Sequence, residues 1–357
     1  MQELIVEEEN NLIKLIILED NKIVEFYEYD KNNMPKIGNI YRAKVKDINS
    51  KTGSVFVYYD ENKIGYIDKI KENVRVNDEI LVMLKKEATL SKDAKMTTDI
   101  TLAGKYIVLI PDSDIRTISK KIIEKNEIIS KINDAILSNF GYILRSESSY
   151  ASLDDILEEA KSLIKKWEDI KNDNINSLLY DANVIDEIIV REFVNNSTKK
   201  IYINSEDIYN KIDSKVSIEI DFDEGTNFLD KFGLITQMED ISKNKIWLKS
   251  SGFINIDFTE ALTAIDVNSG KYLGNSGFDK ENFSYKVNEE AAYEVMRQLR
   301  LKNLGGIVIV DFINMKNPEN KDKIVEIMKN EAKKDRSKVE VYGFTNLGLV
   351  EIARKKV

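Results

Sequence analysis

Two short apolar runs, each closed by an aspartate, constrain this chain more than any other feature. They are Glu260–Gly270 (EALTAIDVNSG) and Gly305–Met315 (GGIVIVDFINM), and their apolar residues end at Asp266 and Asp311. A short, continuous apolar run bounded by glycine or turn residues is typical of a strand that is buried on both faces. The two runs therefore predict two strands in the interior of a sheet.

The segment between the two runs predicts a helix over 288–304. Its apolar side chains recur about every four residues from Ala291 to Leu299, which is the spacing of one helix face. Asn288 can cap the start of this helix, and Gly305 stands where a helix commonly ends. A strand, a helix and a second strand of these lengths predict a right-handed parallel βαβ unit.

Polar side chains gather where the two predicted strands end. Parallel strands bring Asp266 and Asp311 to one edge of the sheet, at the crevice where open α/β sheets bind ligands. Asn268 lies two residues beyond Asp266, so both side chains point to the same face of the strand. Two carboxylates and an amide suit Mg²⁺ that keeps several of its waters. The alternative is that each aspartate only closes a strand at the surface, but a matched pair favours a metal site.

The residues that the chain lacks restrict its chemistry. It contains no cysteine and no histidine, which excludes disulfides, catalytic thiolates, imidazole bases and the usual ligands of zinc. Its net charge of −9 argues against a protein that coats nucleic acid, although it leaves room for a local basic groove. The acidic N-terminus does not resemble a signal peptide, and no apolar run is long enough to span a membrane. These features predict a soluble, cytoplasmic protein.

The predicted secondary structure changes several times along the chain. Residues 37–103 contain five short strands with turn signals, which predicts a small OB-type barrel. Phe56, Tyr58 and Tyr66 in this segment can stack on unpaired bases, and we expect at least one of the three to belong to the core instead. Residues 104–197 are predicted to be mainly helical.

Three segments carry a resemblance to a known family. They are EALTAIDVNSG, NEEAAYEVMRQLRLKNLGGIVIVDFINM and LGLVEIARKK, and their order and spacing resemble the ribonuclease E/G family. The resemblance implies a multidomain fold of the α+β and α/β classes. Its expected parts are an RNase-H-like subdomain in two pieces (1–36 and 198–240), an inserted OB-fold RNA-binding domain of the S1 type (37–103), a 5′-sensor subdomain (104–197) and a DNase-I-like catalytic subdomain (241–357).

The resemblance also implies roles for individual residues. Asp266 and Asp311 correspond to the family's Mg²⁺-binding aspartates, and Asn268 to its orienting asparagine. In the barrel and in the 5′-phosphate pocket the corresponding residues are Phe56, Tyr66 and Lys92, which would contact RNA, and Arg145 and Ser146, which would bind the phosphate.

Four positions depart from the family's pattern. Next to the expected 5′-phosphate pocket stand Glu147 and Ser148, the latter in place of a glycine. Asn314 replaces the second aspartate of the DFIDM motif, and Asn346 replaces a basic residue. The cysteine pair that links two protomers through zinc is also missing. We therefore expect catalysis to survive, no structural zinc, and a homodimer, if one forms, that assembles without zinc.

These observations predict a Mg²⁺-dependent endoribonuclease for RNA processing or decay. Its expected substrate is single-stranded, A/U-rich RNA, and its products would carry 3′-hydroxyl and 5′-phosphate ends. One alternative is a catalytically weak RNA-binding protein, which would need the barrel but not the paired carboxylates. A second alternative is a DNA-directed or broad phosphodiesterase, which would need the carboxylates but not the barrel.

Overall fold

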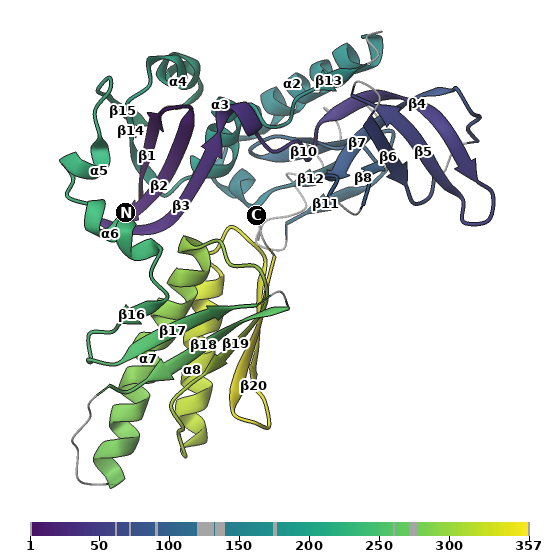
Figure 1. The fold of residues 1–357 in the computed structure, drawn as a ribbon. Helices are drawn as coiled ribbons and strands as arrows, with labels where there is room; N and C mark the ends of the chain where they lie inside the picture. The colour runs from purple at the N-terminus through teal and green to yellow at the C-terminus, as the bar shows by residue number, and fades with distance from the viewer. Residues whose placement is uncertain are drawn as a thin grey trace. The chain divides into compact units, whose positions relative to one another are not determined.

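The chain forms a mixed α+β structure made of two compact units (Figure 1). Unit 1 comprises 1–30, 198–209 and 218–357, and unit 2 comprises 31–197 and 210–217. The computed structural model describes residues 2–60, 63–70, 73–89, 92–119, 132, 140–173, 177–259, 261–270 and 277–355.

The first sheet of unit 1 joins the N-terminus to a later part of the chain. It has five strands in the order β15-β14-β1-β2-β3. β1 runs parallel to β14 and antiparallel to β2. The two-residue turns Asn10–Asn11 and Asp20–Asn21 have positive φ throughout, as type I′ hairpin turns require. The elements are β1 (Gln2–Glu9), β2 (Leu12–Glu19), β3 (Lys22–Asp30), β14 (Thr198–Ile203), α4 (Glu206–Ile212), β15 (Glu219–Phe222), α5 (Phe228–Lys231) and α6 (Ile235–Ile241).

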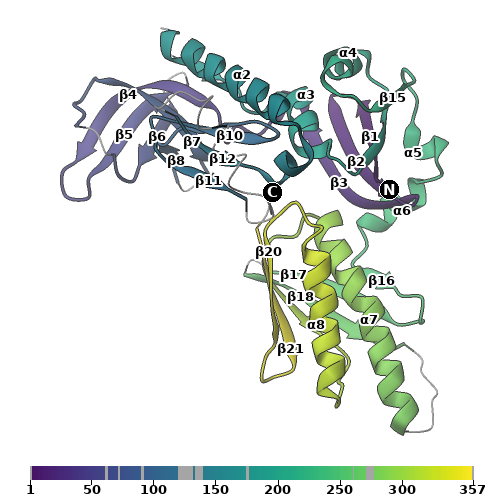
Figure 2. The same cartoon turned by 180° about the vertical axis from the view of Figure 1, so that it is seen from behind.

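The second sheet of unit 1 carries the two aspartates. It has six strands in the order β16-β17-β18-β19-β21-β20, and α7 and α8 lie side by side on one of its faces (Figures 1 and 2). Its core consists of apolar side chains from these two helices and from one face of the sheet. The elements are β16 (Lys245–Trp247), β17 (Phe253–Phe258), β18 (Leu262–Asn268), α7 (Gly277–Leu301), β19 (Gly306–Asp311), α8 (Pro318–Ala332), β20 (Val339–Phe344) and β21 (Leu349–Arg354).

The predicted βαβ unit is present, because β18 and β19 pair in parallel and α7 connects them. The prediction that both strands are buried on both faces is wrong. Burial alternates along β18, where Ile265 and Val267 are buried and Asp266 is exposed. The reason is that α7 and α8 cover one face only, so the face that carries Asp266 stays open in unit 1.

The predicted limits of the connecting helix are also wrong. α7 begins at Gly277, well before Asn288, which is fully buried in the middle of the helix. The helix ends at Leu301, and Asn303 has a φ of 46°. The Leu304 amide then donates to the Leu299 carbonyl over 2.9 Å, which closes the helix as a Schellman motif. Asn303 therefore plays the role that was assigned to Gly305.

Unit 2 contains a closed five-stranded barrel, as predicted. The strand order β4-β5-β6-β8-β7 closes through pairing of β7 with β4. Phe56, Tyr58 and Tyr66 are all half-buried, whereas Tyr41 and Tyr59 fill the interior. The expectation that one of the first three belongs to the core is therefore wrong. The strands are β4 (Ile40–Asn49), β5 (Ser54–Tyr59), β6 (Lys63–Ile67), β7 (Glu79–Lys86) and β8 (Ala94–Thr97), and a 3-10 turn, η1 (Lys31–Asn33), precedes them.

The rest of unit 2 is less helical than predicted, because a four-stranded sheet in the order β11-β12-β10-β9 occupies part of 104–197. α2 begins with a capping box of Ser152 and Asp155 and packs on β10. No helix in the described part of the chain is long and apolar enough to cross a membrane. The elements are β9 (Leu102–Ala103), β10 (Ile107–Pro111), β11 (Arg116–Ile118), β12 (Phe140–Leu144), η2 (Ser146–Tyr150), α2 (Leu153–Asn172), β13 (Leu178–Tyr180), α3 (Ile185–Ile188), a π turn η3 (Ile189–Phe193) and η4 (Asp213–Lys215).

Candidate active site

Asp266 and Asp311 are direct neighbours across two parallel strands. Each is the Cα partner of the other in the register of β18 and β19, and adjacent strands lie about 4.8 Å apart. Directly paired residues of neighbouring strands point to the same face. Both aspartates are exposed and lie on the face of the sheet opposite α7 and α8. The structure thus brings together the two carboxylates that the sequence singled out.

Asn268 orients one of these carboxylates. Its Nδ2 donates a hydrogen bond to Asp266 Oδ2 over 2.7 Å, as their spacing of two residues on one strand allows. The bond leaves Asp266 Oδ1 as a second oxygen of the same carboxylate. Asn268 is half-buried and Asp266 is exposed. The amide therefore fixes the orientation of an exposed carboxylate. All three predicted residues of this site therefore belong to one cluster.

Two residues of α7 hold the loop that follows Asp311, and sequence reasoning missed both. Asn288 Nδ2 donates to the Ile313 carbonyl (2.7 Å), and the Ile313 amide donates to Asn288 Oδ1 (3.0 Å). Glu281 accepts the amides of Lys316 and Asn317, each over 3.1 Å, which lowers the pKa of its carboxyl. The sequence signal for Asn288 is a polar residue at the start of the predicted apolar stripe, a position that also suits a helix cap.

The donor set at Asp266 and Asp311 fits a hard divalent cation. It consists of carboxylate oxygens on an exposed face, with no nitrogen or sulfur ligand. In the part of the chain that the structure describes, no three acidic side chains cluster closely enough to make a complete metal cage. A cation held there would keep most of its coordination positions for water and phosphate, which is how Mg²⁺ is commonly bound.

In the barrel, Phe56 and Tyr66 form a second candidate surface. They are direct partners in the antiparallel register of β5 and β6, so their rings lie on the same side of the barrel wall, outside its core. Lys92 is exposed and forms an isolated bridge with Thr89, whose amide donates to the Lys92 carbonyl over 2.8 Å. Lys95, which the sequence did not single out, is the β8 partner of Tyr66, and its Nζ lies 6.0 Å from the Tyr66 ring centroid.

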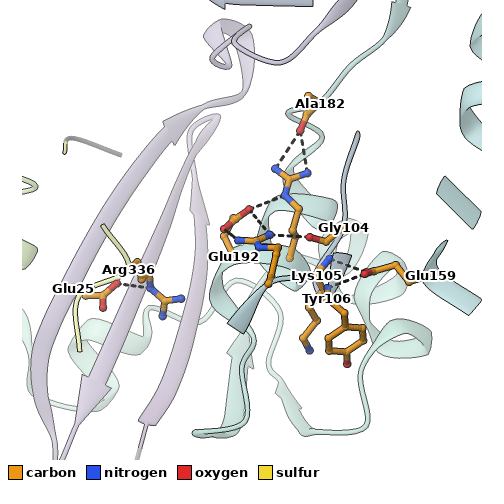
Figure 3. A network of polar contacts seen from close by, with 10 residues as sticks. Glu25, Gly104, Lys105, Tyr106, Glu159, Ala182, Glu192 and Arg336 are labelled. Atoms are coloured by element: carbon orange, nitrogen blue, oxygen red, sulfur yellow. Dashed lines mark hydrogen bonds and ion pairs between the residues drawn. The ribbon is translucent and has the colours of Figure 1, made fainter. Parts of the chain in front are cut away.

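Arg145 belongs to a polar network in unit 2, of which Gly104, Ala182 and Glu192 are labelled in Figure 3. Its Nη2 donates to Glu192 Oε2 over 2.7 Å, and its Nη1 donates to the Gly104 carbonyl over 2.7 Å. Arg191 Nε donates to Glu192 Oε1 over 2.8 Å. One carboxylate is therefore shared by two guanidinium groups. Arg145 therefore forms an ion pair, and its partner is Glu192.

Burial and neighbouring charges shift the pKa values of two groups in and next to this network. Burial alone would raise the pKa of Glu192, but hydrogen bonds and charge from Arg145 and Arg191 bring it below its ordinary value. Burial lowers the pKa of Lys105, against the opposing effect of Glu147 and Glu159. Glu159 also accepts the backbone amides of residues 105–107. Lys105 follows Gly104, whose carbonyl accepts from Arg145, and its Nζ lies 5.4 Å from the Tyr106 ring centroid.

Ser146 lies beside this network, directly after Arg145. Its Oγ is 2.8 Å from the Oγ of Ser119, and the two hydroxyls share one hydrogen bond. The side chain of Ser148 turns back and donates to the Arg145 carbonyl over 2.7 Å. The structure therefore keeps Arg145 and Ser146 on one short stretch after β12, with Ser148 bracing it.

Comparison with known families identifies the chain. Residues 101–357 match the model of the ribonuclease E/G family, and this stretch includes the paired aspartates, Asn268 and the Arg145 network. The chain belongs to the ribonuclease E/G family, as its resemblance predicted.

Individual relatives agree with this assignment. Ribonuclease G of Haemophilus influenzae is 28% identical over an alignment that covers 99% of this chain and 79% of the relative. Ribonuclease G of Escherichia coli K12 is 28% identical, over 83% of this chain and 63% of the relative. Ribonuclease E of Buchnera aphidicola is 27% identical, over 97% of this chain. The chain spans only 39% of that last protein.

Proposed function

We propose that this protein is a Mg²⁺-dependent endoribonuclease that cleaves single-stranded, A/U-rich RNA in RNA processing or decay. The observation that carries the proposal is the direct pairing of Asp266 with Asp311 on an open sheet face, with Asn268 bonded to one of them. The names of the relatives, ribonuclease G and ribonuclease E, support RNA as the substrate.

In this proposal the chain's own residues bind and orient the reactants. Asp266 and Asp311 would hold the cation, and Asn268 keeps the Asp266 carboxylate in one orientation. When bound, Mg²⁺ supplies a Lewis acid that makes water a better nucleophile and polarises the phosphate. Asn288 and Glu281 hold the loop after Asp311 and so position that aspartate. In-line attack of water would leave a 3′-hydroxyl and a 5′-phosphate.

The subdomain layout of the family is also proposed for this chain. One sheet unites β1, β2 and β3 with β14 and β15, which supports an RNase-H-like subdomain made of 1–36 and 198–240. The closed barrel fits an OB fold over 37–103. The mixed sheet with α7 and α8 would be the DNase-I-like catalytic subdomain of 241–357, and 104–197 would be the 5′-sensor subdomain.

The direct test of the function is incubation of the purified protein with a short A/U-rich RNA carrying a 5′-monophosphate. We expect cleavage with Mg²⁺ and none with a chelator. DNA of the same sequence is the control and should remain intact. Binding of the RNA without cleavage under any metal would favour the alternative, a catalytically weak RNA-binding protein. Cleavage of both polymers would favour a broad phosphodiesterase.

The barrel surface gives the first quantitative prediction. Phe56→Ala or Tyr66→Ala is expected to weaken binding of single-stranded RNA by about 1–3 kcal/mol, which is the usual contribution of one stacked base. Fluorescence anisotropy with labelled RNA measures this loss, and thermal unfolding serves as the control. Both rings lie outside the barrel core, so stability should change little. A large drop in melting temperature with unchanged RNA binding would refute the stacking role.

The Arg145 network predicts a preference for the 5′ end of RNA. Arg145 offers a guanidinium to a terminal phosphate, with Ser146 as a hydroxyl donor. We expect faster cleavage of 5′-monophosphate RNA than of 5′-triphosphate or 5′-hydroxyl RNA. Arg145→Ala should lose this preference and leave the rate on 5′-hydroxyl RNA unchanged.

The ion pair between Arg145 and Glu192 bears on this test, and a second ion pair in unit 2 provides its control. A phosphate that binds Arg145 has to compete with the Glu192 carboxylate, which lies 2.7 Å away. Lys166→Ala is a matched control, since Lys166 forms an ion pair with Glu187 in the same unit but outside this network. Equal wild-type rates on the three RNAs would mean that the pocket does not act on the 5′ end.

A further inference from the structure

The strand register places a basic side chain in the same row as the paired aspartates. Lys245 of β16 is the partner of Asn255 in β17, Asn255 is the partner of Asp266, and Asp266 is the partner of Asp311. Residues of one such row point to the same face of the sheet. With strands about 4.8 Å apart, Lys245 begins about 10 Å from Asp266.

The neighbouring row carries two aromatic rings. Trp247 pairs with Phe253, and Phe253 pairs with Asn268. The two rings meet edge to face with their centroids 5.2 Å apart. Lys245 Nζ lies 4.4 Å from the Trp247 ring centroid and 3.8 Å from that of Phe253. We call Lys245, Trp247 and Phe253 the aromatic platform.

The aromatic platform lies outside the hydrophobic core of this sheet. Trp247 is 64% exposed, and neither ring belongs to the core of the sheet or packs on it. A large, mostly exposed aromatic side chain beside a cation is a common means of binding a flat, negatively charged ligand. The cation–π contacts with Lys245 and the edge of Phe253 hold the indole in place, so it is already ordered before a ligand arrives.

We propose that the aromatic platform is a nucleobase-stacking subsite for single-stranded RNA. One base of the RNA stacks on Trp247, and Lys245 attracts the phosphate attached to it. The inference rests on the proposed function, because the same strand of RNA would place its scissile phosphate at Asp266 and Asp311. Since the platform and the aspartates lie on one continuous sheet face, the bound base fixes which phosphodiester bond reaches the carboxylates.

Stacking on Trp247 predicts which feature of the RNA the platform recognises. Every base has a π face, so stacking on an indole tolerates any sequence. The platform therefore selects a position along the RNA and not a particular base. A single abasic nucleotide at the stacked position should weaken binding, whereas abasic nucleotides elsewhere near the cleaved bond should have little effect.

Tryptophan fluorescence tests the contact without requiring cleavage. The chain has two tryptophans, and Trp167 is buried in unit 2 at 4% exposure. In a Trp167→Phe, Asp311→Asn variant, Trp247 is the sole tryptophan and cleavage is switched off. We expect single-stranded RNA to quench its emission with the same Kd that anisotropy of labelled RNA reports. RNA binding with unchanged emission would overturn the proposal, whether or not the protein is a nuclease.

Substitutions on an otherwise unaltered chain test the role of the platform in cleavage. Trp247→Ala should raise KM or the Kd for RNA by about tenfold, in line with the loss of one stacked base, and should lose the sensitivity to the abasic position. Trp247→Phe should restore most of both. The matched control is Tyr342→Ala, because Tyr342 on β20 is also 64% exposed and lies on the opposite edge of the same sheet.

Two results would contradict the proposal. One is equal sensitivity of wild type and Trp247→Ala to every abasic nucleotide. The other is quenching of Trp247 that depends on protein concentration in the absence of RNA, together with a change in sedimentation on Trp247→Ala, because this would assign the platform to contact between two copies of the chain. If wild type cleaves nothing but quenching by RNA persists, the platform stands and the nuclease function fails.

Discussion

Asp266→Asn or Asp311→Asn is expected to abolish Mg²⁺-dependent cleavage of RNA, with a fall in rate of well over tenfold. Each substitution removes one negative charge from a pair of facing carboxylates and changes almost no volume. Both side chains are exposed, so the free energy of unfolding should change by no more than about 0.5 kcal/mol. RNA binding, measured by anisotropy, should stay close to that of wild type.

The matched control is Asp257→Asn. Asp257 is an exposed aspartate in β17 of the same sheet, but its register partner is Ala264 and not either member of the pair. Its substitution should leave the cleavage rate within twofold or so of wild type. If Asp266→Asn or Asp311→Asn still cleaved at a tenth of the wild-type rate, the assignment of the pair as the metal site would be wrong.

The second large effect is expected at a buried ion pair that supports the sheet of Asp266 and Asp311. Arg354 of β21 and Asp335 are joined by two hydrogen bonds, and their side chains are 0% and 2% exposed. Arg354 Nη1 also donates to Asn303 Oδ1 and to the Leu304 carbonyl, each over 3.0 Å. This arginine therefore ties the end of α7 to the strand next to β19.

Arg354→Met is expected to lower the free energy of unfolding of unit 1 by about 3–5 kcal/mol, because it leaves the Asp335 charge buried without its partner. Chemical denaturation measures the loss. The control is Lys338→Met, which breaks the ion pair between Lys338 and Glu340. Those side chains are 76% and 45% exposed, so this change should cost less than about 1 kcal/mol. Equal losses in the two variants would contradict the account of the buried pair.

The pairing of Asp266 with Asp311 was predictable because it depends on local signals. Two apolar runs and one helical stripe between them suffice for a parallel pair, and a parallel pair brings both strand ends together. Whether the second face of the sheet is buried or exposed was not predictable in this way. It depends on where α7 and α8 pack, which is a property of the tertiary structure that no window of the sequence contains.

Asn288 illustrates a second limit of the sequence. An asparagine at the start of an apolar stripe has the same local signature whether it caps a helix or lies inside one. The choice is made by its partner, the backbone of Ile313, which lies 25 residues away along the chain.

Lys95 and Lys245 were missed because their neighbours are set by strand register. Lys95 is near Tyr66 only through the pairing of β6 with β8. Lys245 shares a row with Asp266 only through β16, β17 and β18. The sheet of β9, β10, β11 and β12 was missed for a related reason, because its strands are short and their periodic patterns are correspondingly weak.

One modified RNA tests directly whether water attacks the phosphodiester while Asp266 and Asp311 hold Mg²⁺. A single 2′-deoxynucleotide at the cleavage site removes the ribose hydroxyl that a cyclic-phosphate mechanism needs. We expect Mg²⁺-dependent cleavage to persist at this site, with 3′-hydroxyl and 5′-phosphate ends. Loss of cleavage at the 2′-deoxynucleotide, together with a 2′,3′-cyclic phosphate on the product of the unmodified RNA, would contradict it.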